Sequence, residues 1–162
     1  EAIFLIGAPA GWGAHLGQSA WLRELFGRND GPPPPVDLAH ERRVGDFVRG
    51  LIRDGVATAA HDLSDGGLAV ALAEMAMASG IGAAVAVPDG DALAAFFGED
   101  QGRYLVTVRE SGPARMTAAP GLSVERIGTT GGASLKLGEA RAISIEELKA
   151  AHEGWFPSFM GN

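Results

Sequence analysis

Cysteine is absent from this chain of 162 residues, and no apolar run is long enough to span a bilayer. The lack of cysteine excludes disulfides, thiolate catalysis and cysteine–zinc sites. The sequence opens on an apolar run without a preceding basic segment, so it shows no signal-peptide pattern. We therefore expect a cytoplasmic protein without a membrane span. Because the first residue is Glu1 rather than Met, we also expect a piece of a longer protein.

Positive charge is also scarce. Thirteen Lys and Arg residues stand against twenty Asp and Glu residues, which gives a net charge of −7. An excess of negative charge opposes attraction to phosphate backbones and to anionic lipid surfaces, so neither nucleic acid nor a membrane is an expected partner. The hydrophobic fraction of 46% is sufficient for one core, and residues 1–162 are expected to form a single domain.

Short apolar runs alternate with amphipathic segments along the chain. The runs predict strands over residues 2–9, 56–63, 82–87, 103–108, 122–127 and 133–137. Apolar residues at helical spacing predict helices over residues 18–26, 37–55, 68–80, 91–97 and from 144 to a stop at Pro157. The sequence Thr129 to Gly132, between two strands, predicts a hairpin turn. Together these elements predict a layered α/β or α+β domain with a mixed sheet flanked by helices.

A glycine-rich stretch from Gly11 to Gly17 follows a strand and precedes a helix, as in a dinucleotide-binding fingerprint. A Rossmann unit would also need a second strand that ends in an acidic residue about twenty positions further on. That position falls in the proline run 32–35, so we interpret the stretch as a glycine-rich turn.

The turn HDLSDGG, which joins a strand end to an almost entirely apolar helix, is the strongest candidate for a ligand site. Gly66 and Gly67 would let a ligand approach the backbone N–H groups at the helix start. The helix start favours an anion by up to ~2 kcal/mol, whereas the Asp65 carboxylate about 4 Å away would oppose a phosphate by ~4 kcal/mol at an effective dielectric near 20. A phosphate therefore requires Asp65 to turn away or Mg²⁺ to bridge the two. The alternative is that Ser64 or Asp65 only caps the helix and the glycines serve packing.

His61 begins this turn and could pair with an acidic neighbour in metal or acid–base chemistry. His61 and Asp62 face opposite sides of a strand, however, so only one of them can line a given pocket. A hydrogen-bonded structural role for His61 is the alternative. No residue spacing in the chain supports a Ser/His/Asp triad or a zinc site, and no catalytic residue is assigned.

The loop from Gly98 to Arg103 precedes the strand YLVTV and is a second candidate site. Glu99, Gln101 and Arg103 offer acceptors, an amide and a guanidinium suited to a ribose and a phosphate. A solvated charged loop is the alternative interpretation.

The chain resembles the C-terminal domain of phosphoribosylformylglycinamidine synthase, in the aminoimidazole ribonucleotide synthetase superfamily. The resemblance covers nearly the whole chain and rests on the order of IFLIG, HLGQSAWL, PPPVDLAHERRVGDFVRGLI, HDLSDGGLAVALAEMA, FGEDQGRYLVTV and IGTTGG. It implies the fold of that domain, the last of four in a larger ligase. That ligase converts formylglycinamide ribonucleotide, glutamine and ATP to formylglycinamidine ribonucleotide, glutamate, ADP and phosphate.

The resemblance also has consequences for sites and partners. It implies ATP or ADP and Mg²⁺ as cofactors of the full enzyme, with the catalytic histidine and the principal magnesium ligands in domains absent here. The implied partners are the remaining domains of the subunit, a glutaminase subunit and a small accessory subunit. Gln101 looks like the relic of a substrate-holding glutamine, and with Asp65 it fits a non-catalytic half that retains an auxiliary nucleotide. The residues expected at this nucleotide or phosphate pocket are His61, Ser64, Asp65, Gly66, Gly67, Gln101 and Arg103.

Two alternatives remain for the chain as a whole. The first is a domain of another superfamily member, of the selenophosphate synthetase, thiamine-phosphate kinase or hydrogenase-maturation type, although HLGQSAWL before the proline run argues against it. The second is a packing and assembly module that binds no ligand.

Overall fold

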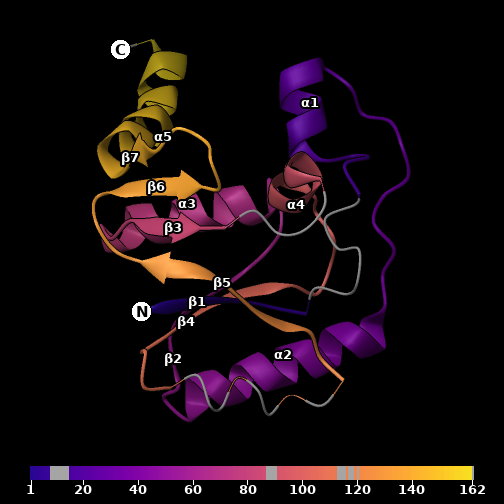
Figure 1. Cartoon of the computed structure of the whole chain (residues 1–162). Coiled ribbons are helices and arrows are strands. Elements are labelled where there is room, and N and C mark those ends of the chain that lie inside the picture. Colours follow the sequence, from indigo (N-terminus) through magenta and orange to yellow (C-terminus); the bar gives the residue numbers. More distant parts are fainter. Residues whose placement is uncertain (8–14, 87–90, 113–115, 117–118, 120, 162) are drawn as a thin grey trace.

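The computed structural model describes residues 1–7, 15–86, 91–112, 116, 119 and 121–161, which form a mixed sheet with helices on both faces (Figure 1). The strands are β1 (Ala2–Ile6), β2 (Ala57–Asp62), β3 (Ala83–Val85), β4 (Tyr104–Val108), β5 (Val124–Thr130), β6 (Ser134–Leu137) and β7 (Ile143–Ser144). The helices are α1 (Ala20–Phe26), α2 (Leu38–Arg53), α3 (Gly67–Ser79), α4 (Ala92–Phe97) and α5 (Ile145–Met160). The expected mixed sheet flanked by helices is confirmed.

The strands lie in the order β2-β4-β1-β5-β3-β6-β7. The pair β3–β6 is parallel, and the other pairs within the described ranges are antiparallel. The predicted strand 2–9 is confirmed over Ala2–Ile6, and positions 8 and 9 lie outside the described residues, as does position 87 of the predicted strand 82–87. The two-residue strand β7 was not predicted.

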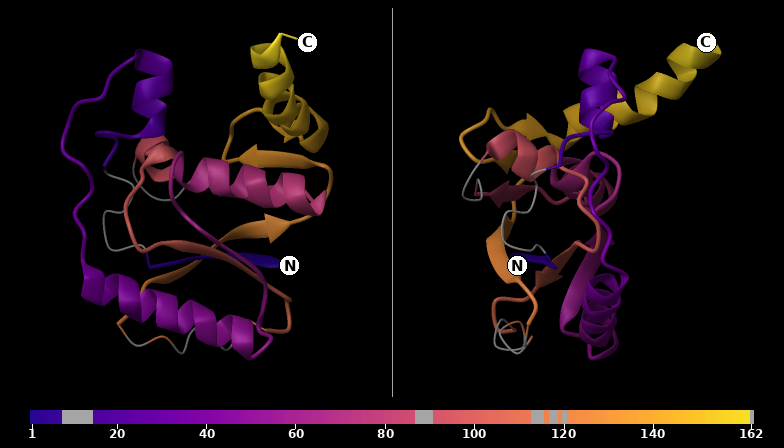
Figure 2. Two further views of the ribbon diagram at one scale, coloured as in Figure 1. Left: turned by 180° about the vertical axis from the view of Figure 1, so that it is seen from behind. Right: turned by 90° about the vertical axis from the view of Figure 1, so that its right-hand side faces the viewer.

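β1 lies inside the sheet and divides the core in two. All of its residues are buried, because helices cover both faces of this strand. Ile3 and Leu5 face α3 and α4, whereas Ala2, Phe4 and Ile6 face α2. Figure 2 shows the same arrangement from two further directions, with α2 on one side of the sheet and α3 on the other. A continuous apolar run is therefore the pattern expected for this strand.

α2 forms where the sequence predicted an amphipathic helix. Asp37 caps its start, with one carboxylate oxygen accepting the backbone N–H groups of Ala39 and His40 at 3.0 Å each. Val44 and Val48 lie on the buried stripe, and the charged face points to solvent. No helix among the described residues has the length and apolarity needed to cross a membrane.

The predicted hairpin at Thr129–Gly132 is wrong. Thr129 and Thr130 belong to β5, and β3 lies between β5 and β6, so the connection crosses the start of β3 instead of folding back. Gly82 sits under this crossing, where its N–H donates to Gly132 at 2.8 Å and its carbonyl accepts from Gly131 at 2.7 Å. A Cβ at Gly82 would lie 2.2 Å from the Ser134 carbonyl oxygen, so only glycine fits beneath the crossing.

The predicted stop at Pro157 is also wrong. α5 continues through Pro157 to Met160 and is closed by Gly161, whose N–H points to the carbonyls of Pro157 and Ser158. Proline removes one hydrogen bond, to the carbonyl of Glu153. Because this part of the helix is exposed, water can satisfy that carbonyl and the helix persists.

Candidate functional site

The turn HDLSDGG connects β2 to α3; one hydrogen bond ties it to the residue before β4, and another closes the turn on itself. The N–H of Leu63 donates to the Arg103 carbonyl at 2.9 Å, and the N–H of Gly67 donates to the Ser64 carbonyl at 3.0 Å. Gly66 is the residue that precedes the helix, in a left-handed conformation with φ of 78°, and it provides no side-chain cap. Ser64 and Asp65 are exposed and do not cap α3, so the capping alternative is wrong for both residues.

Gly67 is a packing residue. Its φ is 63°, and a Cβ there would lie 2.5 Å from the carbonyl oxygen of Gly98 and 3.0 Å from that of Phe96. The end of α4 therefore rests directly on the glycine turn. Backbone approaches of this kind exclude any side chain at position 67.

Glu99 supplies the anion at the start of α3. One of its carboxylate oxygens accepts the N–H of Gly66 at 2.8 Å and the N–H of Ala20, the first residue of α1, at 2.7 Å. A single carboxylate thus joins the starts of two helices, where negative charge is favoured. Glu99 was predicted as an acceptor of the loop but not as a partner of the turn, because no local pattern links positions 20, 66 and 99.

The remaining residues of this loop point in different directions. Arg103 is only 1% exposed, and it donates to the carbonyls of Asp100 at 2.8 Å and Gly98 at 2.6 Å. Burial lowers the pKa of the Arg103 guanidinium from its ordinary value, against the opposing charges of Asp100 and Glu99. Gln101 is exposed, and Asp100 is buried with one carboxylate oxygen on His15. Arg103 therefore holds the loop in shape and does not face solvent.

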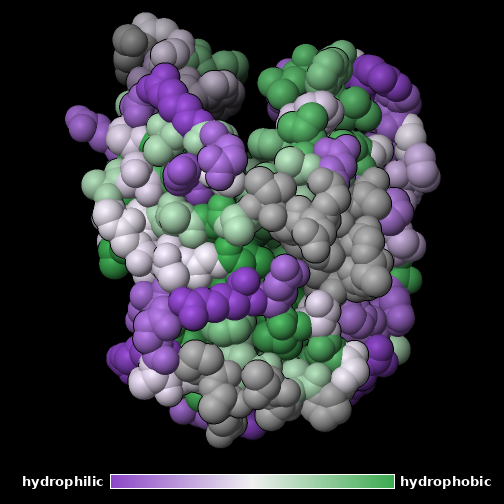
Figure 3. Space-filling model, viewed as in Figure 1, coloured by the Kyte–Doolittle hydropathy of each residue, from purple (hydrophilic) through white to green (hydrophobic). Residues whose placement is uncertain are grey.

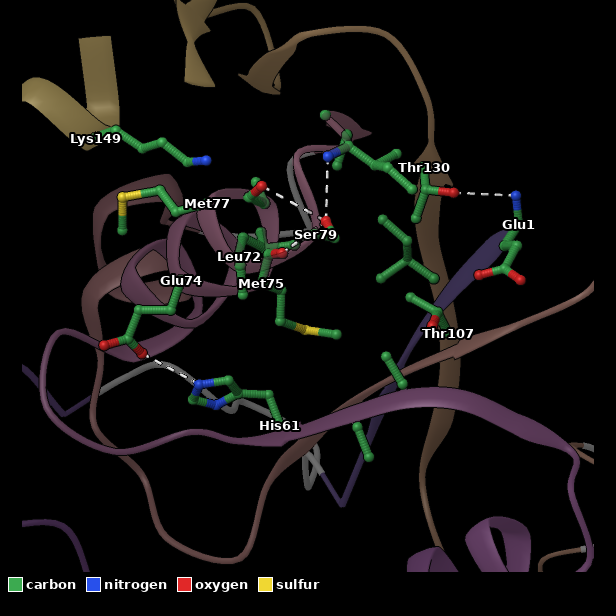
Figure 4. A pocket seen from close by; sticks show the side chains of 18 of the residues that line it. Glu1, His61, Leu72, Glu74, Met75, Met77, Ser79, Thr107, Thr130 and Lys149 are labelled. Atoms are coloured by element: carbon green, nitrogen blue, oxygen red, sulfur yellow. Dashed lines mark hydrogen bonds and ion pairs between the residues drawn. The ribbon is translucent and has the colours of Figure 1, made fainter. Parts of the chain in front are cut away.

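A groove of about 1080 Å³ runs beside α3 and is shown from close by in Figure 4. β2 contributes Ala59, α3 contributes Leu72 and Met75, and α5 contributes Lys149. Lys149 extends from α5 toward the groove and makes no hydrogen bond or ion pair with other described residues (Figure 4). The lining also includes charged and polar side chains such as Glu74 and Glu153. A concave surface that combines apolar residues with convergent polar groups is typical of a binding surface.

His61 lies in this groove and is held by two partners. Its Nε2 lies 3.2 Å from a carboxylate oxygen of Glu74 on α3 (Figure 4). Its Nδ1 lies 2.5 Å from the Asp62 carbonyl oxygen and 3.8 Å from the Asp62 carboxylate. His61 pairs with Leu105 on the α3 side of the sheet, whereas Asp62 pairs with Tyr104 on the α2 side. The expectation that only one of the two lines a given pocket is confirmed, since His61 borders the groove and Asp62 does not.

The predicted site residues thus divide into two groups. His61 and Ser64 line the groove, whereas the other five predicted residues lie outside its lining. Those five are Asp65, Gly66, Gly67, Gln101 and Arg103. Within the described parts of the chain, no three His, Asp or Glu side chains converge to hold a metal ion. The glycine-rich stretch of the rejected dinucleotide motif falls largely at residues 11–14, outside the described residues.

Residues 1–137 match the family model described as "AIR synthase related protein, C-terminal domain", and the chain belongs to that family. The predicted resemblance is confirmed. The subunit "Phosphoribosylformylglycinamidine synthase subunit PurL" of Chelativorans sp. (strain BNC1) is 65% identical over 99% of this chain. Its namesake in Sinorhizobium fredii (strain HH103) is 61% identical over 99% of the chain. The chain spans 22% of the length of each of these relatives.

Solved structures share the fold. "T. maritima PurL complexed with FGAR" superposes with a TM-score of 0.70 at 15% identity, over 91% of this chain and 27% of that one. "T. maritima PurL complexed with AMPPCP" has a TM-score of 0.68 at 15% identity, over 91% and 25%. Hydrogenase maturation protein HypE in complex with ATP has a TM-score of 0.58 at 18% identity, over 88% and 50%. At these identities the structures establish the fold, while the sequence relatives favour the PurL type over the hydrogenase-maturation type.

Proposed function

We propose that this chain is the C-terminal domain of a PurL-type subunit of phosphoribosylformylglycinamidine synthase. The observation that carries the proposal is the 65% identity over 99% of the chain to a protein of that name. The activity is then the ATP- and glutamine-dependent conversion of formylglycinamide ribonucleotide to formylglycinamidine ribonucleotide in purine biosynthesis. In this scheme residues 1–162 are the last domain of a cytoplasmic polypeptide that works with a glutaminase subunit and a small accessory subunit.

Within that enzyme the domain is a scaffold and one wall of an auxiliary nucleotide pocket. Solved PurL proteins of similar fold are described as complexed with ATP, ADP and AMPPCP, which supports a nucleotide in the full enzyme. The Glu99 carboxylate lies at the start of α3, and Asp65 is the exposed residue just before Gly66, so a phosphate fits there only together with a cation such as Mg²⁺. Asp65 is the exposed side chain of the turn that can face such a phosphate, whereas the exposed Ser64 borders the groove.

An assembly module without a ligand is the second candidate. The N–H of Gly66 is already bonded to Glu99, and Arg103 points into the protein, so two of the predicted phosphate donors are engaged internally. This observation favours a domain that packs against its neighbours and binds no ligand.

Two experiments test these candidates. The purified chain alone is expected to show no glutamine- or ammonia-dependent amidine formation, whereas the full-length subunit with its partner subunits is active. Turnover by the chain alone would contradict its role as a domain of a larger enzyme. An inactive full-length complex would contradict the assigned reaction.

The second experiment is calorimetric titration of the full-length subunit with ADP and Mg²⁺. Asp65→Asn is expected to weaken Mg²⁺-dependent ADP binding about tenfold, which corresponds to about 1.4 kcal/mol. Glu125→Gln, which removes an exposed carboxylate of β5, is the matched control and should leave the affinity unchanged. Substitution of Gly67 is unsuitable, because a side chain there collides with Gly98. If the Asp65→Asn subunit binds ADP as tightly as the control, the assembly module is the better account. The same conclusion follows if the unsubstituted subunit binds no ADP.

A further inference from the structure

The second half of α5 carries large apolar side chains that nothing in the described part of the chain covers. Ile145, at the start of the helix, is its one buried residue. Trp155 and Phe159 are 63% and 71% exposed and stack on each other with ring centroids 5.1 Å apart. Phe156 and Met160, each 59% exposed, lie beside them. We call these four residues the α5 tip.

α1 presents a similar surface at the same end of the molecule. It has no buried residue, and Leu25 and Phe26 are 66% and 57% exposed. Trp21 packs against Phe26 and, at 6.3 Å between ring centroids, against Phe97 of α4. α1 and α5 project from the same end in all views, and Figure 3 shows hydrophobic side chains gathered over α1. We call Leu25 and Phe26 the α1 tip.

These tips are unsuited to permanent exposure. Glu153 is the last charged residue of α5, so the following turns have no charged side chain facing water. A helix with only one end packed depends on further burial, because short helices are marginal in water. Contiguous exposed aromatic and aliphatic surface marks an interaction site in soluble proteins.

We propose that the two tips dock together onto another domain of the same polypeptide, in an uncharged, apolar recess. This inference rests on the proposed function, in which the chain is one domain of a longer subunit. The family model ends at residue 137, before α5, whereas the PurL relatives match 99% of the chain and are more than four times as long. α5 is therefore a feature that the chain shares with the longer PurL relatives and that lies outside the family domain.

A second copy of this chain is a less suitable occupant. Each copy carries a net charge of −7, so self-association would bring like charges together. A neighbouring domain of the same polypeptide also meets the tips at the high effective concentration that a covalent connection provides.

The test is hydrogen exchange in the full-length subunit compared with the 162-residue chain. Amides of residues 20–26 and 150–160 are expected to exchange at least tenfold more slowly in the full-length subunit. Trp155→Glu with Phe159→Glu should abolish this protection in both segments. Ala150→Glu with Ser158→Glu adds the same charge to the opposite face of α5, so it serves as the matched control and should preserve the protection.

Equal exchange rates in the two proteins would overturn the proposal. Protection that appears in the 162-residue chain alone, rises with concentration and accompanies a dimer mass in light scattering would also overturn it, in favour of a second copy. Because exchange is measured without substrate, a failure of the proposed reaction is recognised separately, as missing turnover with the α1 and α5 amides still protected.

Discussion

The carboxylate of Glu99 accepts the backbone N–H of Gly66 at 2.8 Å, although the two residues are 33 positions apart in the chain. The same oxygen accepts the N–H of Ala20 at 2.7 Å. The loop after α4 therefore provides the charge that stabilises the starts of α1 and α3, a task usually performed by a residue next to the helix.

Replacing Glu99 by Ala is expected to lower the free energy of unfolding by about 2 kcal/mol, because two helix-start N–H groups lose their acceptor. Glu99→Gln keeps an acceptor oxygen but loses the charge, so it should cost about 1 kcal/mol. Urea denaturation measures both values. Gln101→Ala, in the same loop but exposed, is the control and should stay within about 0.5 kcal/mol of the original protein. A Glu99→Ala protein as stable as this control would refute the bridging role.

Comparing Gly67 with Gly80 tests whether the end of α4 packs closely against the turn. Both are left-handed, with φ of 63° and 70°, but a Cβ at Gly80 meets nothing within 4 Å, whereas one at Gly67 meets Gly98. Gly80→Ala is expected to cost about 1 kcal/mol from backbone strain alone. Gly67→Ala should cost about 3 kcal/mol, because overpacking adds to the strain. Equal losses in thermal or urea unfolding would show that the α4 end does not press on Gly67.

Arg103→Met is expected to destabilise the protein by about 3 kcal/mol, since the carbonyls of Gly98 and Asp100 lose a buried charged donor. Arg103→Lys should recover little, because an ammonium does not reproduce the geometry of the guanidinium. The exposed Arg109, replaced by Met, controls for the loss of charge. Combined with Glu99→Ala, the Arg103→Lys loss should be less than additive, as both residues shape one loop. Full additivity in urea unfolding would argue against this coupling.

Asp37, which caps the start of α2, should make the stability of the folded protein depend on pH. Hydrogen bonds from the amides of His40 and Ala39 lower the pKa of this carboxyl in the folded protein. The stabilisation is therefore present above the ordinary aspartate pKa of about 3.9 and is lost as the pH falls through the lower folded value.

Asp37→Asn keeps a capping oxygen without the titration. The stability difference between the original protein and this variant should shrink below about pH 4, when urea midpoints are compared from pH 3 to 7. Glu125→Gln, an exposed carboxylate of β5 without a capping role, is the control. A difference that stays constant over this range would contradict the cap's electrostatic contribution.

The elements were predictable because local patterns encode them. The stripe of Val44, Val48 and Leu51 predicted α2, and the Ser144 and Glu147 spacing predicted a capping box that the structure contains. The turn at Thr129–Gly132 was misinterpreted because a glycine pair between two strands does not reveal that a third strand passes between them.

The candidate site was only partly predictable. Gly66 and Gly67 were recognised as a close-approach turn, but the approaching group is the backbone of Phe96 to Gly98, which is distant in sequence. The Arg103 guanidinium is chemically suited to bind a phosphate. Its buried position, which is a property of packing, directs that chemistry to the loop's own carbonyls.

The sequence by itself determined the order of strands and helices, the apolar stripes that build two cores and the family to which the chain belongs, because these depend on spacing along the chain. The tertiary structure decided which groups meet. It brought Glu99 to Gly66, separated His61 and Ser64 from the other predicted residues in lining the groove, and left the α1 and α5 tips exposed among the described residues. Such outcomes depend on hydrogen bonds and contacts between distant segments, which form only once the sheet and its helices have packed.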